Sequence, residues 1–331
     1  MIITRTPYRL SLFGGGTDYP DWFSRNPSRV IAAAMAHYCY ISIRALPPFF
    51  EHHTRVVYSR IEAVQSNGLI EHPCVVACLN FQGIEDGLEI HHDGDLPARS
   101  GVGSSSAFTV GLLLGLQAYR HAAVSQRRLA LDAIHVERTL LNESVGVQDQ
   151  VVSAFGGLRL INMGPEVQWA SLPFTLPKQY RDALEKHVLL GFTGVSRNSS
   201  EHAFQKILNI KNGKTDSELF EIQSLTESAI SLFENQSEFN EIGKLLKLSW
   251  DQKTRLSTAL GDSIYLDLIN IGLRNGAWGG KLMGAGGGGF FYFLAPPNSH
   301  ERIKSALPQI KVWVPFRFDT RGAQVIFASD D

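Results

Sequence analysis

The 331-residue sequence contains little cysteine and almost no net charge. Three cysteines, an odd and sparse set, do not indicate the disulfide framework of a secreted protein. Cys74 and Cys78 have helical i, i+4 spacing, but no second pair of ligands lies near them in the sequence, so we predict buried thiols rather than a zinc site. A formal net charge of −1 gives no reason to expect a nucleic-acid partner.

Long apolar runs are also missing. The longest, around 108–116, is too short to span a bilayer, and the first residues lack the apolar core of a signal peptide. The sequence therefore predicts a cytoplasmic protein that binds neither a membrane nor nucleic acid.

The length allows two domains or one large one, and 44% hydrophobic residues suffice for a substantial core. Short strand-like runs dominate the first third, and helical periodicity begins after Ser105. Strands and helices do not strictly alternate, which favours an α+β fold over a doubly wound sheet. The stretch 167–176, with Pro173 and Pro177, marks the expected boundary, which gives domains 1–176 and 177–331.

The elements that matter for the site follow from the same patterns. We expect helices at 108–120, 125–142, 148–155, 216–237 and 239–259. We expect strands at 2–4, 8–13, 30–36, 38–45, 158–162, 187–192, 290–294, 310–315 and 322–328.

The most informative stretch is 97–107, Pro-Ala-Arg-Ser-Gly-Val-Gly-Ser-Ser-Ser-Ala, which leads into an apolar helical segment. Glycines allow backbone N–H groups to approach a ligand closely, and a helix start adds further free N–H groups and the positive end of its dipole. Such a site binds anions, and serine hydroxyls suit phosphate or hydrated Mg²⁺. An ordinary serine N-cap after a flexible loop is the alternative interpretation.

A second glycine cluster spans 279–289 and contains the pattern Gly-x-Gly-x-x-Gly at Gly284, Gly286 and Gly289. A dinucleotide fold requires a strand before this loop and a helix after it, whereas the residues that follow, 290–294, are strand-like. A Walker loop is absent too, because Leu208 stands where its first glycine belongs. Any nucleotide site must have another form.

Two further features carry polar residues at turns. In 5–19 a strand leads into three glycines and Asp18, and in 146–150 the sequence Gly-Val-Gln-Asp-Gln opens an otherwise apolar helix. Taken singly, Asp18 reads as an Asx-turn residue and Asp149 as a helix cap.

Together, in this order and spacing, the four features resemble the GHMP kinases, the superfamily of galactokinase, homoserine kinase and mevalonate kinase. The match covers essentially the whole chain: Arg9 with 14–18 resembles the first motif, 97–107 the second and 281–289 the third. The resemblance implies a ribosomal-protein-S5-like N-terminal domain, a ferredoxin-like C-terminal domain, and ATP and Mg²⁺ at a cleft between them.

Carried over by position, Asp149 resembles the catalytic aspartate and Arg9 the cation beside it. Glu137 stands where the family places a Mg²⁺-binding carboxylate, with Ser105 as its hydroxyl partner. The family's ATP-phosphate loop corresponds to Gly101, Val102, Gly103, Ser104, Ser105 and Ser106.

The acceptor is implied by the first motif. Galactokinases have Glu where this chain has Gly15, and that Glu contacts the sugar's primary hydroxyl, so its loss leaves room for a longer or phosphorylated tail. The surrounding sequence is similar to D-glycero-D-manno-heptose 7-phosphate kinases. The expected substrate-binding residues are Gly15, Gly16, Thr17, Asp18, Gly286 and Gly287, with Arg197 and Lys253 as candidates for the distal phosphate.

Three alternatives stay open. The two basic residues, Arg197 and Lys253, are equally interpretable as solvated surface charges. The chain also fits a fucokinase-like or other sugar 1-kinase, or a non-catalytic sugar or nucleotide sensor, since fold does not fix function. A homodimer is compatible with the sequence.

Overall fold

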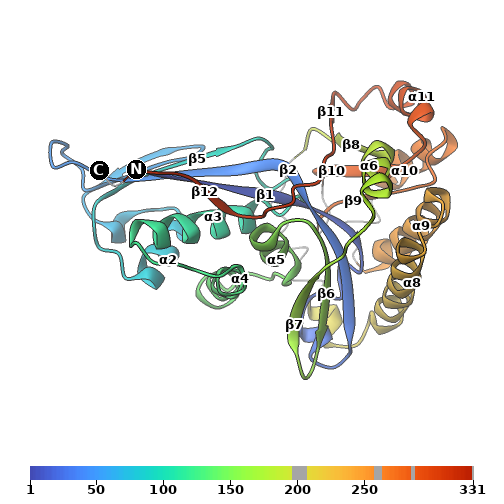
Figure 1. The fold of residues 1–331 in the computed structure, drawn as a ribbon, viewed down its shortest axis with the longest axis horizontal. Helices are drawn as coiled ribbons and strands as arrows, with labels where there is room; N and C mark the ends of the chain where they lie inside the picture. The colour runs from blue at the N-terminus through green and yellow to red at the C-terminus, as the bar shows by residue number, and fades with distance from the viewer. Residues whose placement is uncertain (196–206, 257–262, 285–287, 330–331) are drawn as a thin grey trace.

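The computed structural model describes residues 1–195, 207–256, 263–284 and 288–329 (Figure 1). They form two antiparallel-rich sheets with helices packed on them. In the first sheet the order is β12-β1-β2-β5-β3-β4, and β6 and β7 extend it from β2. Its strands are β1 (Ile2–Phe13), β2 (Ser28–Ala45), β3 (Thr54–Val57), β4 (Ile61–Val64), β5 (Leu88–Gly94), β6 (Leu158–Gly164), β7 (Gln168–Pro173) and β12 (Gln324–Ala328).

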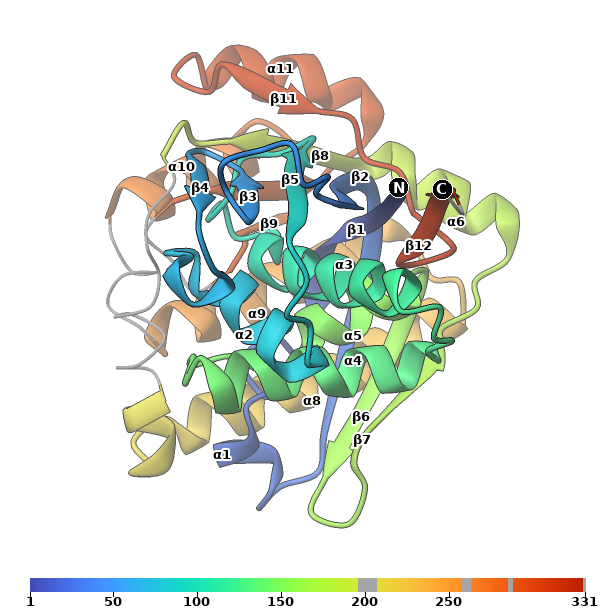
Figure 2. The ribbon, with the colours of Figure 1, turned by 90° about the vertical axis from the view of Figure 1, so that its left-hand side faces the viewer.

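Helices cover one face of this sheet, where α3 lies against β1 and β2 (Figures 1 and 2). The helices of this half are α1 (Pro20–Phe23), α2 (Pro73–Gln82), α3 (Ser104–Tyr119), α4 (Gln126–His135) and α5 (Gln148–Phe155), with short helical turns at Asn67–Leu69 (η1) and Val136–Leu140 (η2). Gly111 and Gly115 of α3 face Ile41 and Ile43 of β2, and buried apolar side chains of α3, such as Leu112 and Leu116, share one core with them.

The two longest strands each join what the sequence suggested as two. β1 and β2 pair antiparallel from Ile2 with Ile43 to Phe13 with Ile31. The sequence patterns break at Pro7 because proline cannot donate to a ladder. The structure continues through it with a register shift between Pro7 and Tyr8. β1 is therefore long enough to run from the N-terminus to the candidate active site at Arg9.

The second sheet has four strands in the order β11-β8-β10-β9, all paired antiparallel. The strands are β8 (Val188–Phe192), β9 (Gly279–Leu282), β10 (Phe290–Leu294) and β11 (Val312–Val314). The described helices beside them are α6 (Lys178–His187), α8 (Asp216–Glu234), α9 (Phe239–Arg255), α10 (Ser263–Arg274) and α11 (His300–Ala306), with η3 (Pro297–Ser299). Taken in chain order, these strands lie fourth, first, third, second, which is the ferredoxin-like arrangement. The expected α+β fold and the ferredoxin-like arrangement of the second sheet are confirmed.

The chain does not end in the second sheet. β12 pairs antiparallel with β1, and Phe318 forms a bridge with Met35 of β2. The last described residues therefore lie beside the N-terminus, at the far end of the first sheet (Figure 1). The expected boundary stretch contains β7, the last strand of the first sheet before α6 and β8. The division at residue 176 stays a prediction.

Two further expectations are buried thiols rather than a zinc site, and the absence of a segment that spans a membrane. Cys39, Cys74 and Cys78 are buried and free. Within the described ranges, no group of three or more His, Cys, Asp and Glu side chains is arranged to hold a metal ion. The same ranges contain no helix of the length and apolarity that crossing a bilayer requires.

Candidate active site

The loop before α3 has the backbone that its glycines allow. Gly101 and Gly103 have φ of 82° and 72°, in the left-handed region that favours glycine, and Gly103 is the N-cap of α3. Ser104, Ser105 and Ser106 form the first turn of the helix, where backbone N–H groups lack intrahelical partners. This loop and helix start therefore have the form of an anion site, and its use for ATP stays a prediction.

The described part of the glycine cluster at 279–289 packs on this loop. The N–H of Phe290 donates to the carbonyl of Ser100 at 2.8 Å, so β10 is bonded directly to the loop. A Cβ on Gly101 would stand 2.7 Å from the carbonyl oxygen of Met283. Both clusters thus need glycine because their backbones touch. Gly286 and Gly287 lie outside the described residues.

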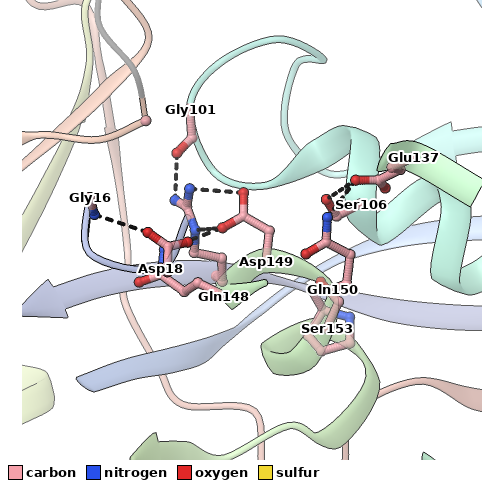
Figure 3. Close-up of polar contacts among 12 residues, drawn as sticks. Gly16, Asp18, Gly101, Ser106, Glu137, Gln148, Asp149, Gln150 and Ser153 are labelled. Atoms are coloured by element: carbon pink, nitrogen blue, oxygen red, sulfur yellow. Dashed lines mark hydrogen bonds and ion pairs between the residues drawn. The ribbon is translucent and has the colours of Figure 1, made fainter. Parts of the chain in front are cut away.

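Arg9 and Asp149 form the centre of the site (Figure 3). Arg9, buried on β1, donates from Nε to Oδ1 of Asp149 at 2.5 Å and from Nη2 to Oδ2 at 2.9 Å. Its Nη1 donates to the carbonyl of Gly101 at 2.6 Å. The Asp149 side chain, on the first turn of α5, is 26% exposed. The arginine thus fixes a reachable carboxylate beside the glycine loop.

The first motif forms a tight turn next to this pair. Asp18 is buried and accepts a hydrogen bond from the N–H of Gly16 at 2.9 Å (Figure 3). The Thr17 hydroxyl donates to the carbonyl of Gly14 at 2.9 Å. Burial, with the charges of Asp18 and Asp149 nearby, raises the pKa of Tyr19, so its hydroxyl stays protonated. Asp18 therefore holds the turn, and a sugar contact for it stays a prediction.

Glu137 lies within η2, a π-helical turn that follows α4. Its Oε2 accepts from the Ser106 hydroxyl at 2.9 Å and from the Gln150 amide at 2.6 Å (Figure 3). Burial raises the pKa of Glu137 to about 7. Its Oε1 has no hydrogen-bond partner in the part of the chain that the structure describes.

The structure places Ser106, not Ser105, against Glu137. Ser105 is exposed on the first turn of α3, whereas Ser106 is buried one residue further along the helix. The spacing in sequence does not distinguish them, because consecutive helical residues point about a quarter turn apart. Gln150 is the last residue of the motif at 146–150, and its bond to Glu137 has no signal of its own in the sequence.

Of the two basic residues expected to bind the distal phosphate, the structure describes only Lys253. Lys253, on α9, is 6% exposed and donates to the carbonyl of Gly284 at 3.0 Å, so it is not a solvated surface charge. Arg197 lies outside the described residues. A further cation, Lys281 on β9, is buried and donates to the carbonyl of Leu12 at 2.9 Å, which ties the second sheet to β1.

Comparisons with known proteins agree with this arrangement. Residues 70–157 match the family model for the GHMP kinases N terminal domain, and residues 229–311 match that for the GHMP kinases C terminal domain. A curated relative, D-glycero-alpha-D-manno-heptose 7-phosphate kinase of Campylobacter jejuni, is 24% identical over 98% of each chain.

Solved structures show the same fold over the full length. A D-glycero-D-manno-heptose 1-phosphate kinase from Bacteriodes thetaiotaomicron superposes with a TM-score of 0.76 at 21% identity, covering 100% of both chains. Lactococcus lactis galactokinase, complexed with galactose, gives 0.74 at 16% identity, covering 98% of this chain and 94% of that one. The two family models, the shared fold and the three glycine motifs around Arg9 and Asp149 together show that the chain belongs to the GHMP kinase family.

Proposed function

We propose that this protein is a sugar 1-kinase that transfers the γ-phosphoryl group of ATP to the anomeric hydroxyl of D-glycero-D-manno-heptose 7-phosphate, giving the 1,7-bisphosphate. The observation that carries the proposal is the Arg9–Asp149 pair, which lies at the start of α5 and is bonded to the glycine loop at the start of α3. A proton acceptor and an anion cradle thus meet at one place.

Phosphoryl transfer needs few groups besides this proton acceptor and this anion site. Phosphoryl transfer requires aligned attacking and leaving oxygens and neutralisation of the charge that spreads over the phosphoryl group. Asp149 accepts the proton of the acceptor hydroxyl, and Arg9 keeps the carboxylate in place through two bonds. The loop 101–106 binds the phosphates through its N–H groups and serine hydroxyls.

The residues present fit a magnesium ion. The unpartnered Oε1 of Glu137 supplies a hard anionic oxygen, and the hydroxyls of Ser105 and Ser106 are the nearby oxygen candidates in the first turn of α3. Bound there with ATP, Mg²⁺ would neutralise charge on the phosphates. Gln150 and Ser106 hold the other oxygen of Glu137 and so fix the carboxylate's orientation.

Three observations support heptose 7-phosphate as the acceptor: the glycine at position 15, the buried Lys253, and the similarity to a named relative. Gly15 has no side chain where galactokinases have Glu, and Lys253 is a buried cation next to Gly284. The Campylobacter jejuni relative, which matches over almost the full length, is named for phosphorylating heptose 7-phosphate. Arg197 is proposed as a second cation for the distal phosphate. Because ATP and sugar phosphates are cytoplasmic metabolites, we propose that the protein acts there.

A coupled assay of ADP formation tests the proposal. We expect kcat/KM to be highest for heptose 7-phosphate, compared with free heptose, galactose and fucose, and the product to carry its new phosphate at O1. A higher value for fucose or galactose would assign the protein to another sugar 1-kinase activity. Binding of ATP and sugar without turnover of any acceptor would identify a sensor instead.

A further inference from the structure

The two oxygens of the Asp149 carboxylate have different surroundings. Oδ1 accepts two N–H groups, one from Arg9 Nε at 2.5 Å and one from the side-chain amide of Gln148 at 3.3 Å (Figure 3). Among the residues that the structure describes, Oδ2 accepts only from Arg9 Nη2, at 2.9 Å. A carboxylate oxygen has two lone pairs, so the described donors use both at Oδ1 and leave one at Oδ2.

Oδ2 also faces the glycine loop. A Cβ built on Gly103, the N-cap of α3, would lie 3.2 Å from this oxygen and 3.1 Å from Arg9 Cγ. Because glycine has no such atom, Gly103 places no side chain over Oδ2. The Asp149 side chain is 26% exposed, so an acceptor hydroxyl can reach the carboxylate. The oxygen with the free lone pair is therefore the one that faces the proposed phosphate site.

Burial holds the Gln148 side chain in place beside the carboxylate. Gln148 is the first residue of α5 and is 4% exposed. An ionised carboxylate only accepts hydrogen bonds, so the amide nitrogen faces Oδ1 of Asp149 and the amide oxygen points elsewhere. That oxygen lies 4.0 Å from the position of a Cβ on Gly15, which is an ordinary contact distance. The turn of the first motif therefore lies behind the amide.

We infer that Gln148 is a positioning residue: together with Arg9 it holds Oδ1 of Asp149, and Oδ2 is the atom that accepts the proton. In this step the O–H bond of the acceptor hydroxyl breaks and its proton moves to Oδ2. The hydroxyl oxygen forms a bond to the γ-phosphorus of ATP, the bond from that phosphorus to the ADP oxygen breaks, and ADP leaves with the electron pair. Two donors from different elements, β1 and α5, keep Oδ2 turned toward the loop, as transfer between aligned oxygens requires. This inference rests on the proposed sugar 1-kinase function.

The test compares the wild type with three variants. We would measure kcat and the KM values of ATP and heptose 7-phosphate, by ADP formation, for Gln148→Met, Gln148→Glu and the control Gln117→Met. Methionine keeps the length of the side chain and removes the donor, whereas glutamate keeps the shape as well but puts a second negative charge beside Oδ1. Gln117, on α3, is a matched control because its half-buried amide also donates to a side-chain oxygen, that of Gln82 at 2.8 Å.

A positioning role predicts an order of rates. In Gln148→Met kcat should fall about five- to tenfold, because one N–H group is lost from Asp149. In Gln148→Glu it should fall about a hundredfold, because two adjacent carboxylates repel each other. Both KM values should stay within about twofold of the wild type, since Gln148 contacts no substrate, and Gln117→Met should keep the wild-type kcat. A packing role predicts the opposite order, because glutamate reproduces the shape and polarity of glutamine better than methionine does.

The other outcomes overturn the inference. A wild-type kcat in Gln148→Met, or a higher kcat in Gln148→Glu than in Gln148→Met, would show that the amide does not position Asp149. A raised KM of the sugar with unchanged kcat would make Gln148 a substrate contact instead. Melting temperatures identify the folded variants, and a folded Gln148→Glu with wild-type kcat is decisive by itself.

Failure of the proposed function is distinguishable from failure of this inference. If heptose 7-phosphate is not a substrate, the proposed acceptor fails, and the same comparison with the sugar that the wild type does phosphorylate still decides the role of Gln148. If the wild type phosphorylates no sugar, the inference falls together with the proposed function.

Discussion

Arg9 on β1 holds Asp149, 140 residues later in the chain, through two hydrogen bonds of 2.5 and 2.9 Å. The same guanidinium donates to the carbonyl of Gly101 at 2.6 Å. One side chain therefore connects three segments: the strand of the first motif, the glycine loop of the second, and the helix that carries the carboxylate. The planar fork of arginine makes this geometry possible, and a lysine ammonium does not reproduce it.

Asp149→Asn should abolish most turnover and leave ATP binding nearly unchanged. The amide keeps the shape of the side chain but cannot accept the hydroxyl proton, and loss of a general base typically costs about 10²–10⁴ in rate. Steady-state kinetics with saturating sugar, together with calorimetric titration of ATP, would measure both quantities. Normal turnover of this variant would show that another group is the base.

Arg9→Lys should lower kcat by about ten- to hundredfold, because the single ammonium cannot make two parallel bonds to Asp149 and a third to Gly101. The melting temperature should also fall, since Arg9 is buried. Arg5→Lys, on the same strand, is the control and should keep wild-type kcat. Equal kcat for Arg9→Lys and the wild type would contradict a positioning role for the fork.

Glu137→Gln should raise the Mg²⁺ concentration needed for half-maximal activity, because a neutral amide replaces the proposed anionic ligand. Ser105→Ala and Ser106→Ala compared in the same titration identify the hydroxyl that matters. Ser106 bonds to Glu137, so its loss should also reorient the carboxylate. Wild-type Mg²⁺ dependence in Glu137→Gln would remove the proposed metal role from that residue.

Lys253→Met should reduce the preference for heptose 7-phosphate over free heptose by about ten- to hundredfold, since a charge-assisted bond to phosphate contributes about 1.5–3 kcal/mol. Arg197→Met should act in the same direction. The measurement is the ratio of the two kcat/KM values. Lys247→Met, on the same helix but half-exposed and paired with Asp251, is the control. An unchanged ratio in Lys253→Met would place the distal phosphate elsewhere.

His92 should lower the stability of the protein as the pH falls through about 6.5, whereas Glu137, whose pKa is raised to about 7, should increase the stability over the same range. Burial lowers the pKa of His92, which contacts the edge of Phe108, and that of His72, which stacks on the same ring. Because the folded-state pKa lies below the unfolded value, the unfolded chain binds protons first, and acidification favours it.

Denaturant unfolding at pH 7.5 and pH 5.5 measures this effect. The free energy of unfolding at pH 5.5, relative to that at pH 7.5, should be higher in His92→Gln than in the wild type. His121→Asn alters an exposed histidine and should keep the wild-type difference. An identical difference in His92→Gln and the wild type would exclude His92 as a contributor.

The sequence by itself identified the elements whose signals are local. The helix at 148–155 and the strand at 290–294 have the predicted bounds, because apolar periodicity and flanking glycines mark both. The order of the glycine motifs identified the family, since each loop must bring its backbone close to a ligand or to another loop. The resemblance to the same family also predicts that Arg9 lies beside Asp149.

Tertiary structure decided what depends on contacts between distant segments. Helix α2 at Pro73–Gln82 has apolar residues on all sides and no clear period, and it forms because it is packed beside α3. The return of β12 to β1 depends on a sheet edge that no local pattern reveals. The choice of Ser106 over Ser105 as the partner of Glu137 is set by the rotation of α3 against η2.

The buried side chains around the site show the same division most clearly. Lysine in a polar helix usually lies on the surface, yet Lys253 is buried where α9 meets Gly284. Ser11 and Gln148 both lie near Gly15 only because β1 and the start of α5 meet there. The sequence determined which chemical groups are available, whereas the packing of the two sheets and their helices determined which groups meet, because burial and hydrogen bonding between distant segments are not encoded in local periodicity.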